Sequence, residues 1–215
     1  MATTWLQAVN KVQRRLREST TASVNTTAYS AMIGEWVNET KQEVEDAWNW
    51  NVLRQSTSVV TIPSTPNYQL INVGNRTRCL NVYSDTNNYF LTPIHVDDAT
   101  QYYLGDNNVG VPRYYTFNGQ NGDNLLINLY PTPSAVQTIS FQLVVPQVEL
   151  VADNDIIIVP AQPVILGAYM RALVERGEDG STQYQWAAKA YDDALATAIS
   201  QDEARTPGEL VFYAV

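Results

Sequence analysis

The one histidine of the sequence stands close to two carboxylates. His95, Asp97 and Asp98 lie in the stretch IHVDDAT, and imidazole with carboxylates can bind a metal or act as a general base beside an orienting acid. On a strand, His95 and Asp97 would face one side and Asp98 the other. The same residues also describe a strand end followed by a turn that Asp97 caps. We favour this structural interpretation and expect neither a metal nor a catalytic base here.

Three acidic clusters could supply acid–base pairs of the kind that hydrolyse glycosides. They are EVEDAW (Glu43, Glu45, Asp46), YDD (Asp192, Asp193) and QDE (Asp202, Glu203). Each lies in a stretch with helical periodicity, where neighbouring carboxylates usually form a solvated face. The sequence has no G-x-S-x-G, no glycine-rich phosphate loop and no H-E-x-x-H. We therefore predict a protein that is not an enzyme and that uses no cofactor.

Aromatic side chains offer a further chemistry, because rings can stack on sugars or bases. Tyr114 and Tyr115 stand together in a strand-like run. Alternation along a strand would turn one ring inward and the other outward, and contact with another subunit explains an outward ring as well as a ligand does. Cys79 is the single cysteine, which excludes an internal disulfide, and its position within another strand-like run predicts a place in the core.

Helical patterns occupy both ends of the chain. The first helix has an apolar stripe at spacings of three and four, formed by Trp5, Val9, Val12 and Leu16, with Thr4 as its expected N-cap. A second helix is expected from about Thr27 to Trp48. A third covers QPVILGAYMRALVERG with Pro163 in its first turn and a stripe of Ile165, Tyr169, Leu173 and Val174. A fourth is expected to begin at the cap Thr182 and to end before Pro207.

Between these helices the period changes to two. Six short runs read as strands with Gly, Asn and Pro between them: STSVVTIP, RCLNVYS, NYFLTPI, RYYTFN, NLLINLY and QTISFQLVVP. NGQNGDN has the residues of a hairpin turn, and VDDATQYYLG has helical character. We predict an α+β protein in which both termini form a discontinuous four-helix domain and a small antiparallel β-sandwich or barrel is inserted. The expected boundaries are 1–55 with 161–205 for the helices, 56–160 for the β-domain and 206–215 for an extended tail.

The charge distribution limits the possible partners. The net charge is −9, and the acidic excess lies in residues 56–215, whereas residues 1–55 are balanced. The one basic cluster is KVQRRLRE, so a footprint that grips nucleic acid is missing, while an acidic wall that repels DNA fits. The sequence shows neither a secretion signal nor a stretch of transmembrane length, and we expect synthesis in a cytoplasm and no membrane contact.

The final residues, ELVFYAV, form an apolar and β-prone segment. An exposed segment of this kind would favour aggregation. We predict that Glu209, Leu210, Val211, Phe212 and Tyr213 dock on another protein, by strand addition or in a groove.

Several of these stretches resemble a known family. GVPRYY…LLINLYPTP resembles the β-domain motif G-x-P-x-x-Y…L-x-L-x-P-x-P of head-to-tail adaptor proteins of short-tailed phages, related to tail tubular protein A. The flanking stretches VNETKQEVEDAWNWNVL and DNDIIIVPAQPVILGAYMRALVERGED resemble the helix before that β-domain and the return into the helices after it. The resemblance covers residues 1 to about 203.

This resemblance implies a virion structural protein of the phage neck. Such a protein forms a ring, commonly of twelve copies, between the portal and the tail nozzle, and it extends the DNA channel and supports tail assembly. The implied partners are the protein itself, the portal protein, the nozzle or tubular protein and a tail fibre, while genomic DNA passes through without specific binding. The candidate channel-facing residues are Asp192, Asp193, Asp202 and Glu203, although the helix with Glu35, Glu39, Glu43 and Asp46 competes. Arg14, Arg15 and Arg17 are candidates for the subunit interface.

Two other classes of function stay open at this point. A hydrolase directed at glycans or peptidoglycan would need two carboxylates placed together in a cleft. A carbohydrate-binding module would be a monomer with an exposed flat platform of Tyr or Trp rings.

Overall fold

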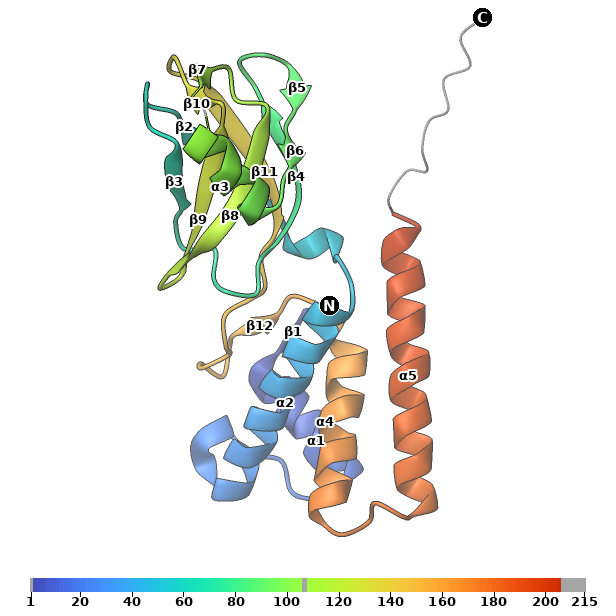
Figure 1. Ribbon diagram of the computed structural model, residues 1–215. Coiled ribbons are helices and arrows are strands. Elements are labelled where there is room, and N and C mark those ends of the chain that lie inside the picture. The colour runs from blue at the N-terminus through green and yellow to red at the C-terminus, as the bar shows by residue number, and fades with distance from the viewer. Residues whose placement is uncertain (1, 106–107, 206–215) are drawn as a thin grey trace, which may run out of the picture. The chain divides into compact units, whose positions relative to one another are not determined.

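The computed structural model describes residues 2–105 and 108–205 of the chain (Figure 1). The chain divides into two compact units. The helical unit combines Met1–Leu53 with Gln147–Val215, and the β unit is Arg54–Pro146. The predicted docking segment Glu209–Tyr213 lies outside the described residues.

Four α-helices make up most of the described helical unit. They are α1 (Trp5–Arg15), α2 (Ala28–Ala47), α4 (Ala161–Glu175) and α5 (Thr182–Glu203). Short 3-10 turns precede and follow α2, namely η1 (Val24–Thr26) and η2 (Asn51–Leu53). Helix α4 packs against α1, α2 and α5, and α5 runs alongside α4 at the outer side of this unit (Figure 1). Helix α4 is therefore its central element.

Side-chain caps fix the beginnings of these helices. Thr4 caps α1 as predicted, because its hydroxyl accepts a hydrogen bond from the Gln7 N–H and the Gln7 side chain accepts one from the Thr4 N–H. The predicted cap Thr182 of the last helix is wrong by one residue. Ser181 has the extended backbone of a cap, and its hydroxyl accepts from the Tyr184 N–H at 3.0 Å.

The apolar stripes of the helices form the core of this unit. All four stripe residues predicted for α1 are buried. In α4 the expected Ile165, Tyr169 and Leu173 are buried, but Val174 is 48% exposed because it follows Leu173 directly and lies on another face of the helix. Gly167 permits the closest approach, since an added Cβ would overlap Thr40 Cγ2 on α2 and lie 3.1 Å from Tyr191 Cε2 on α5.

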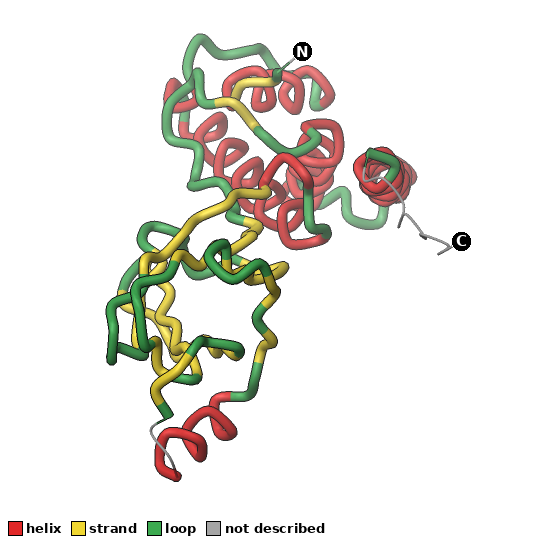
Figure 2. The backbone as a smooth tube through the Cα atoms, turned by 90° about the horizontal axis from the view of Figure 1, so that it is seen from above, coloured by secondary structure: helices red, strands yellow, loops and turns green. Residues whose placement is uncertain are grey.

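The β unit contains two four-stranded sheets. One has the order β2-β11-β4-β5 and the other β3-β9-β8-β6. Their strands are β2 (Arg54–Val60), β3 (Asn67–Leu70), β4 (Arg78–Ser84), β5 (Tyr89–Phe90), β6 (Thr92–Pro93), β8 (Tyr114–Asn121), β9 (Asn124–Tyr130) and β11 (Thr138–Val144). Buried residues of both sheets form one core, among them Val82, Ile127 and Phe141. In the tube view of Figure 2 these strands are yellow, and helix α3 (Val96–Gly105) is red.

Pairing in this unit is not purely antiparallel, in contrast to the expected sandwich. Strand β6 pairs parallel with β8, and β7 (Val109–Gly110) pairs parallel with β10 (Thr132–Pro133). The chain between β6 and β8 contains α3 and β7, which gives the long connection that a parallel pair requires.

The predicted hairpin is present between β8 and β9. Asn121 pairs with Asn124, so the turn is Gly122–Asp123, and Gly122 has a φ of 61° that suits glycine. Gly119, with a φ of 90°, lies where the register shifts between Phe117 and Gln120. The stretch NGQNGDN therefore serves strand pairing, through one bulge and one tight turn.

Residues 147–160 belong to the helical unit, whereas the sequence assigned them to the β-domain. The physical reason is their backbone pairing. Strand β12 (Ile156–Ile157) pairs antiparallel with β1 (Thr3–Thr4) at the beginning of the chain. Asn38 on α2 also donates to the Leu150 carbonyl and accepts from the Leu150 N–H, each at 3.0 Å.

Candidate functional site

The predicted catalytic candidates of the β unit lie on an open surface. His95 Nδ1 lies 3.3 Å from Asp97 Oδ2, but these side chains are 75% and 91% exposed. The Asp97 N–H also approaches His95 Nδ1 at 3.4 Å, at the position just before α3. Asp97 and Asp98 both lie in the first turn of α3, so Asp97 is not the cap that the sequence suggested.

The acidic cluster of α2 separates into two different environments. Glu43 forms an ion pair with Arg171 of α4, and Glu39 lies 3.3 Å from the same guanidinium. Glu45 is fully buried and lies 3.2 Å from the ammonium of Lys41, which is also fully buried. The carboxylates of Glu43 and Glu45 therefore take part in structural contacts and do not form a pair around a cleft.

The acidic candidates of α5 also differ from one another. Asp192, Asp193 and Glu203 are exposed, but Asp202 is 5% exposed. Its Oδ2 accepts from the Asn51 backbone N–H at 2.9 Å and from the Asn51 side chain at 3.2 Å. The expectation of a channel-facing Asp202 is corrected on this ground, because its carboxylate holds the end of α5 against the turn after α2.

The three arginines proposed for a subunit interface have unequal exposure. Arg14 is exposed, and its Nε donates to the Asn10 carbonyl at 3.2 Å. Arg15 is half-buried, with its guanidinium 5.8 Å from the centre of the Tyr169 ring. Arg17 is exposed and has a φ of 61°. Arg14 and Arg17 are thus available to a neighbour, whereas Arg15 already packs within its own unit.

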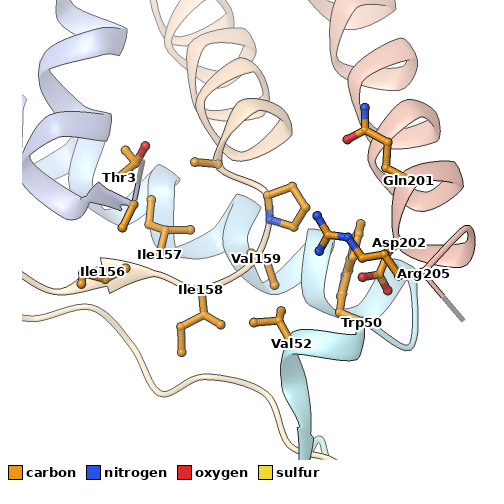
Figure 3. A pocket seen from close by; sticks show the side chains of 13 residues that line it. Thr3, Trp50, Val52, Ile156, Ile157, Ile158, Val159, Gln201, Asp202 and Arg205 are labelled. Carbon is orange, nitrogen blue, oxygen red and sulfur yellow. The ribbon is translucent and has the colours of Figure 1, made fainter.

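One opening of the helical unit is a groove that we call the β12 groove. It has a volume of about 490 Å³. Four segments line it: Ala2 and Thr3 precede α1, Trp50 and Val52 follow α2, Ile156–Ala161 run into α4, and Gln201, Asp202 and Arg205 lie at the end of α5 (Figure 3). Val52, Ile156 and Ile158 are 51%, 49% and 43% exposed. Three large apolar side chains that gather in one depression indicate a surface that another segment covers.

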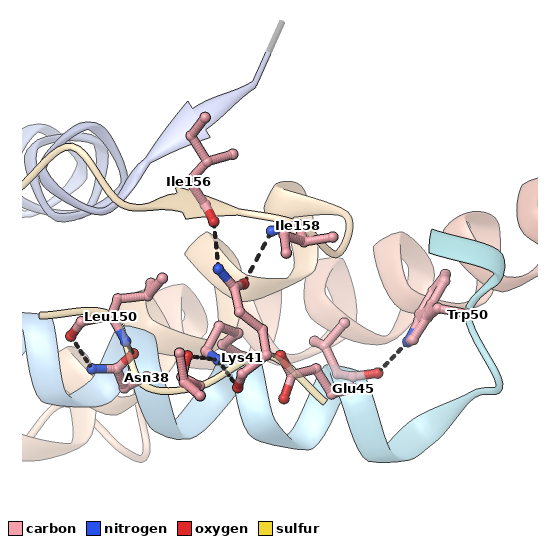
Figure 4. A network of polar contacts seen from close by, with 10 residues as sticks. Asn38, Lys41, Glu45, Trp50, Leu150, Ile156 and Ile158 are labelled. Carbon is pink, nitrogen blue, oxygen red and sulfur yellow. Dashed lines mark hydrogen bonds and ion pairs between the residues drawn. The ribbon is translucent and has the colours of Figure 1, made fainter. Parts of the chain in front are cut away.

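A polar network holds the wall of the β12 groove (Figure 4). The Gln147 side chain donates to the Ile156 carbonyl at 2.7 Å and accepts from the Ile158 N–H at 3.3 Å. The ammonium of Lys41 donates to the Gln147 and Val148 carbonyls at 2.8 and 2.9 Å. Residues 147 and 148 are thus fixed to α2 and to the strand that lines the groove.

Sequence reasoning did not identify Lys41, Glu45 and Gln147 as structural residues. A signal was present for Lys41, because it continues the helical spacing of the buried Ile33 and Val37, and Glu45 follows four residues later. Gln147 gave no local signal.

The β unit carries aromatic contacts and a second opening. Tyr102 stacks on Tyr130 with ring centres 4.9 Å apart, and Tyr114 lies 6.4 Å from Tyr130. Tyr114 is exposed and Tyr115 buried, as the alternation predicted. The second opening, of about 520 Å³, is lined by Cys79 and Tyr115 among others. Burial raises the pKa of the Cys79 thiol and of the Tyr115 hydroxyl, which lie 4.0 Å apart.

Two absences hold for the described ranges, 2–105 and 108–205. No group of three or more His, Cys, Asp or Glu side chains there could hold a metal ion. None of the helices in these ranges is both long enough and apolar enough to cross a bilayer.

Comparison with known protein families gives a match over most of the chain. The family model of the SU10 adaptor protein matches residues 3–211, which is nearly the whole chain. No curated protein matches the chain.

Proposed function

Because the chain belongs to the SU10 adaptor protein family and is a phage adaptor, a structural protein of the virion, we propose that it is the head-to-tail adaptor. In this proposal it forms a ring, with twelve copies as the expected number, between the portal and the tail nozzle. The ring extends the DNA channel and is a platform for tail assembly, in the manner of the tail tubular protein A group of short-tailed phages. The family match over residues 3–211 is the observation that carries the proposal.

The surface of the helical unit supports a role in assembly. The β12 groove exposes Val52, Ile156 and Ile158, and Trp186 on α5 is 58% exposed. Apolar side chains of this size are typical of surfaces that a partner protein covers. We assign the helical unit to ring formation and the β unit to contact with tail components.

The exposed carboxylates of α5 support a wall along which DNA can slide. Asp192, Asp193 and Glu203 remain candidates for the channel, and the chain carries a net charge of −9. Like charge repels the phosphate backbone, so DNA passes such a wall without binding to it. Asp202 is not included, since it is buried against Asn51.

Electron microscopy of the protein mixed with the portal of the same phage tests this function. The expected result is closed rings that stack on the portal and have the same rotational symmetry as the portal. A chain that stays monomeric with and without the portal would contradict the proposal. Binding of that monomer to peptidoglycan fragments would then favour a carbohydrate-binding module, and their cleavage would favour a hydrolase.

A further inference from the structure

The β12 groove opens at the place where the described chain ends. Arg205, the last described residue, is one of the residues that line it, together with Gln201 and Asp202 of α5. Beyond Arg205 the sequence continues with Thr-Pro-Gly and then with ELVFYAV. An apolar groove and an apolar segment are thus separated by three residues of the same chain.

We propose that Glu209–Tyr213 fold back and bind in the β12 groove of their own chain. This inference deepens the proposed function and rests on it for its biological meaning. In the free chain the segment would be covered, and it would be released when a partner in the virion binds it. The same five residues would then bind two different surfaces in succession.

The residues between the groove and the segment favour a reversal of direction. Pro at the second position and Gly at the third position of a β-turn fit a type II turn, and Pro207–Gly208 have this order. After such a turn, five extended residues span about 17 Å. A tether this short gives an effective concentration on the order of millimolar, so that even a segment with an intrinsic Kd of about 0.1 mM would be bound in roughly nine chains of ten.

The chemistry of the groove indicates how the segment is bound. The backbone groups of Ile156 and Ile158 that point away from β1 already bond to the Gln147 side chain. An added strand would therefore find these edge groups occupied, whereas the side chains of Ile156, Ile158 and Val52 remain exposed. We accordingly choose groove binding through side chains over strand addition.

Charge adds to the apolar complementarity. Arg205 is the one basic residue among those that line the groove, and Glu209 begins the segment. Arg205 is exposed, so its guanidinium can pair with an incoming carboxylate.

A crosslinking experiment on the full chain tests this inference. In a background of Cys79→Ser, the pair Ile158→Cys and Phe212→Cys is treated with a short bis-maleimide. The expected product is a crosslink within one chain, identified by mass spectrometry of the monomer. The matched control pairs Val174→Cys with Phe212→Cys, because Val174 is 48% exposed, lies in the last turn of α4 and is not among the groove residues. Ile156→Cys replaces Ile158→Cys if the latter does not fold.

Each outcome decides the inference. Efficient crosslinking within the chain for the groove pair, and not for the control, supports it. Equal crosslinking of both pairs, or none of the groove pair, overturns it. A product that joins two chains also overturns it, since the segment would then bind a neighbouring copy.

Proteolysis provides a second readout that needs no cysteine. Chymotrypsin can cut after Phe212 and Tyr213, and a segment held in the groove is cut more slowly because cleavage follows the population of the open form. Ile158→Glu is expected to raise the cleavage rate at least about fivefold, and Val174→Glu to leave it unchanged. Equal rates in wild type and Ile158→Glu would overturn the inference.

These tests separate the inference from the proposed function. Both use the isolated chain and need no portal. Rings on the portal without the internal crosslink would refute the fold-back alone, whereas the crosslink without rings would refute the head-to-tail function alone.

Discussion

The buried ion pair of α2 allows the most quantitative prediction. Lys41 and Glu45 are both fully buried, and the ammonium donates to Glu45 and to the carbonyls of Gln147 and Val148. Removal of one member of a buried pair leaves an uncompensated charge and costs about 3–5 kcal/mol. We therefore expect Glu45→Gln to lower the free energy of unfolding by about 3 kcal/mol.

Replacement of Lys41 tests a second contribution, the hydrogen bonds that hold residues 147 and 148 against α2. Lys41→Met also removes the donor for the Gln147 and Val148 carbonyls, and each buried acceptor without a partner costs about 1–3 kcal/mol. We expect Lys41→Met to be more destabilising than Glu45→Gln. The double variant Lys41→Met/Glu45→Leu should recover part of the loss, because no charge remains buried, but not all of it.

Urea unfolding followed by circular dichroism at 222 nm measures these effects in the helical unit. With a slope of about 2–3 kcal/mol per molar urea, a loss of 3 kcal/mol lowers the midpoint by about 1–1.5 M. Glu43→Gln is the matched control on the same helix. Its carboxylate is 51% exposed and pairs with Arg171, so its loss should cost no more than about 1 kcal/mol. A Glu45→Gln midpoint equal to that of the control would refute the reasoning, and so would a Lys41→Met variant more stable than Glu45→Gln.

Three further predictions concern other parts of the helical unit. Gly167→Ala should destabilise by about 1–3 kcal/mol, because its Cβ has no room between helices, whereas Gly180→Ala meets nothing within 4 Å and should change little in the same urea assay. Asp202→Asn should lower the free energy of unfolding by about 1.5–3 kcal/mol, because its hydrogen bonds to Asn51 lose their charge assistance. Asp192→Asn, at an exposed position, should lower it by less than about 0.5 kcal/mol. Equal effects of the two substitutions would contradict the role assigned to Asp202. Backbone N–H groups lower the pKa of Asp155, so its carboxylate stabilises the fold above the unfolded pKa of about 3.9, and this contribution is lost as the pH falls through the lower folded value. Asp155→Asn should thus be less stable than wild type at pH 7, and the difference should shrink in urea titrations below about pH 4; a pH-independent difference would contradict this.

Local patterns were enough to predict the helices and the hairpin. The stripe from Trp5 to Leu16 and the cap Thr4 depend on neighbours within one or two turns, and the structure confirms both. The turn at Gly122–Asp123 likewise follows from residue types that tolerate its backbone. Such features can be recognised because the interactions that determine them lie close together in sequence.

Features that depend on distant partners were missed. Lys41 resembles a surface residue of a helix until residues 147 and 148, more than a hundred positions later, supply the carbonyls that hold its ammonium. Asp202 stands beside Glu203 in an acidic pair, yet it is buried because Asn51 lies against it. The parallel strand pairs of the β unit also could not be predicted, because pairing direction depends on how the chain crosses between strands.

The β12 groove shows the same limit for a functional site. Its walls come from residues 2–3, 50–52, 156–161 and 201–205, and each segment alone is an ordinary turn, strand or helix end. The sequence predicted only that ELVFYAV docks on another protein, and it gave no indication of a surface in this chain that could bind such a segment. The position of that surface could be found only after the four segments were placed together.

Asp202, near the end of α5, lines the groove and also bonds to the turn that follows α2. Asp202 bonds to the backbone and side chain of Asn51, and Asn51 begins η2, after which the β unit starts at Arg54. The end of α5 is therefore tied to this turn by Asp202. Asp202→Asn should weaken that tie and, under the fold-back described above, should speed chymotryptic cleavage after Phe212, because Arg205 would no longer be held beside the groove. Unchanged cleavage in Asp202→Asn, together with faster cleavage in Ile158→Glu, would show that the groove binds the segment without help from the tie to Asn51.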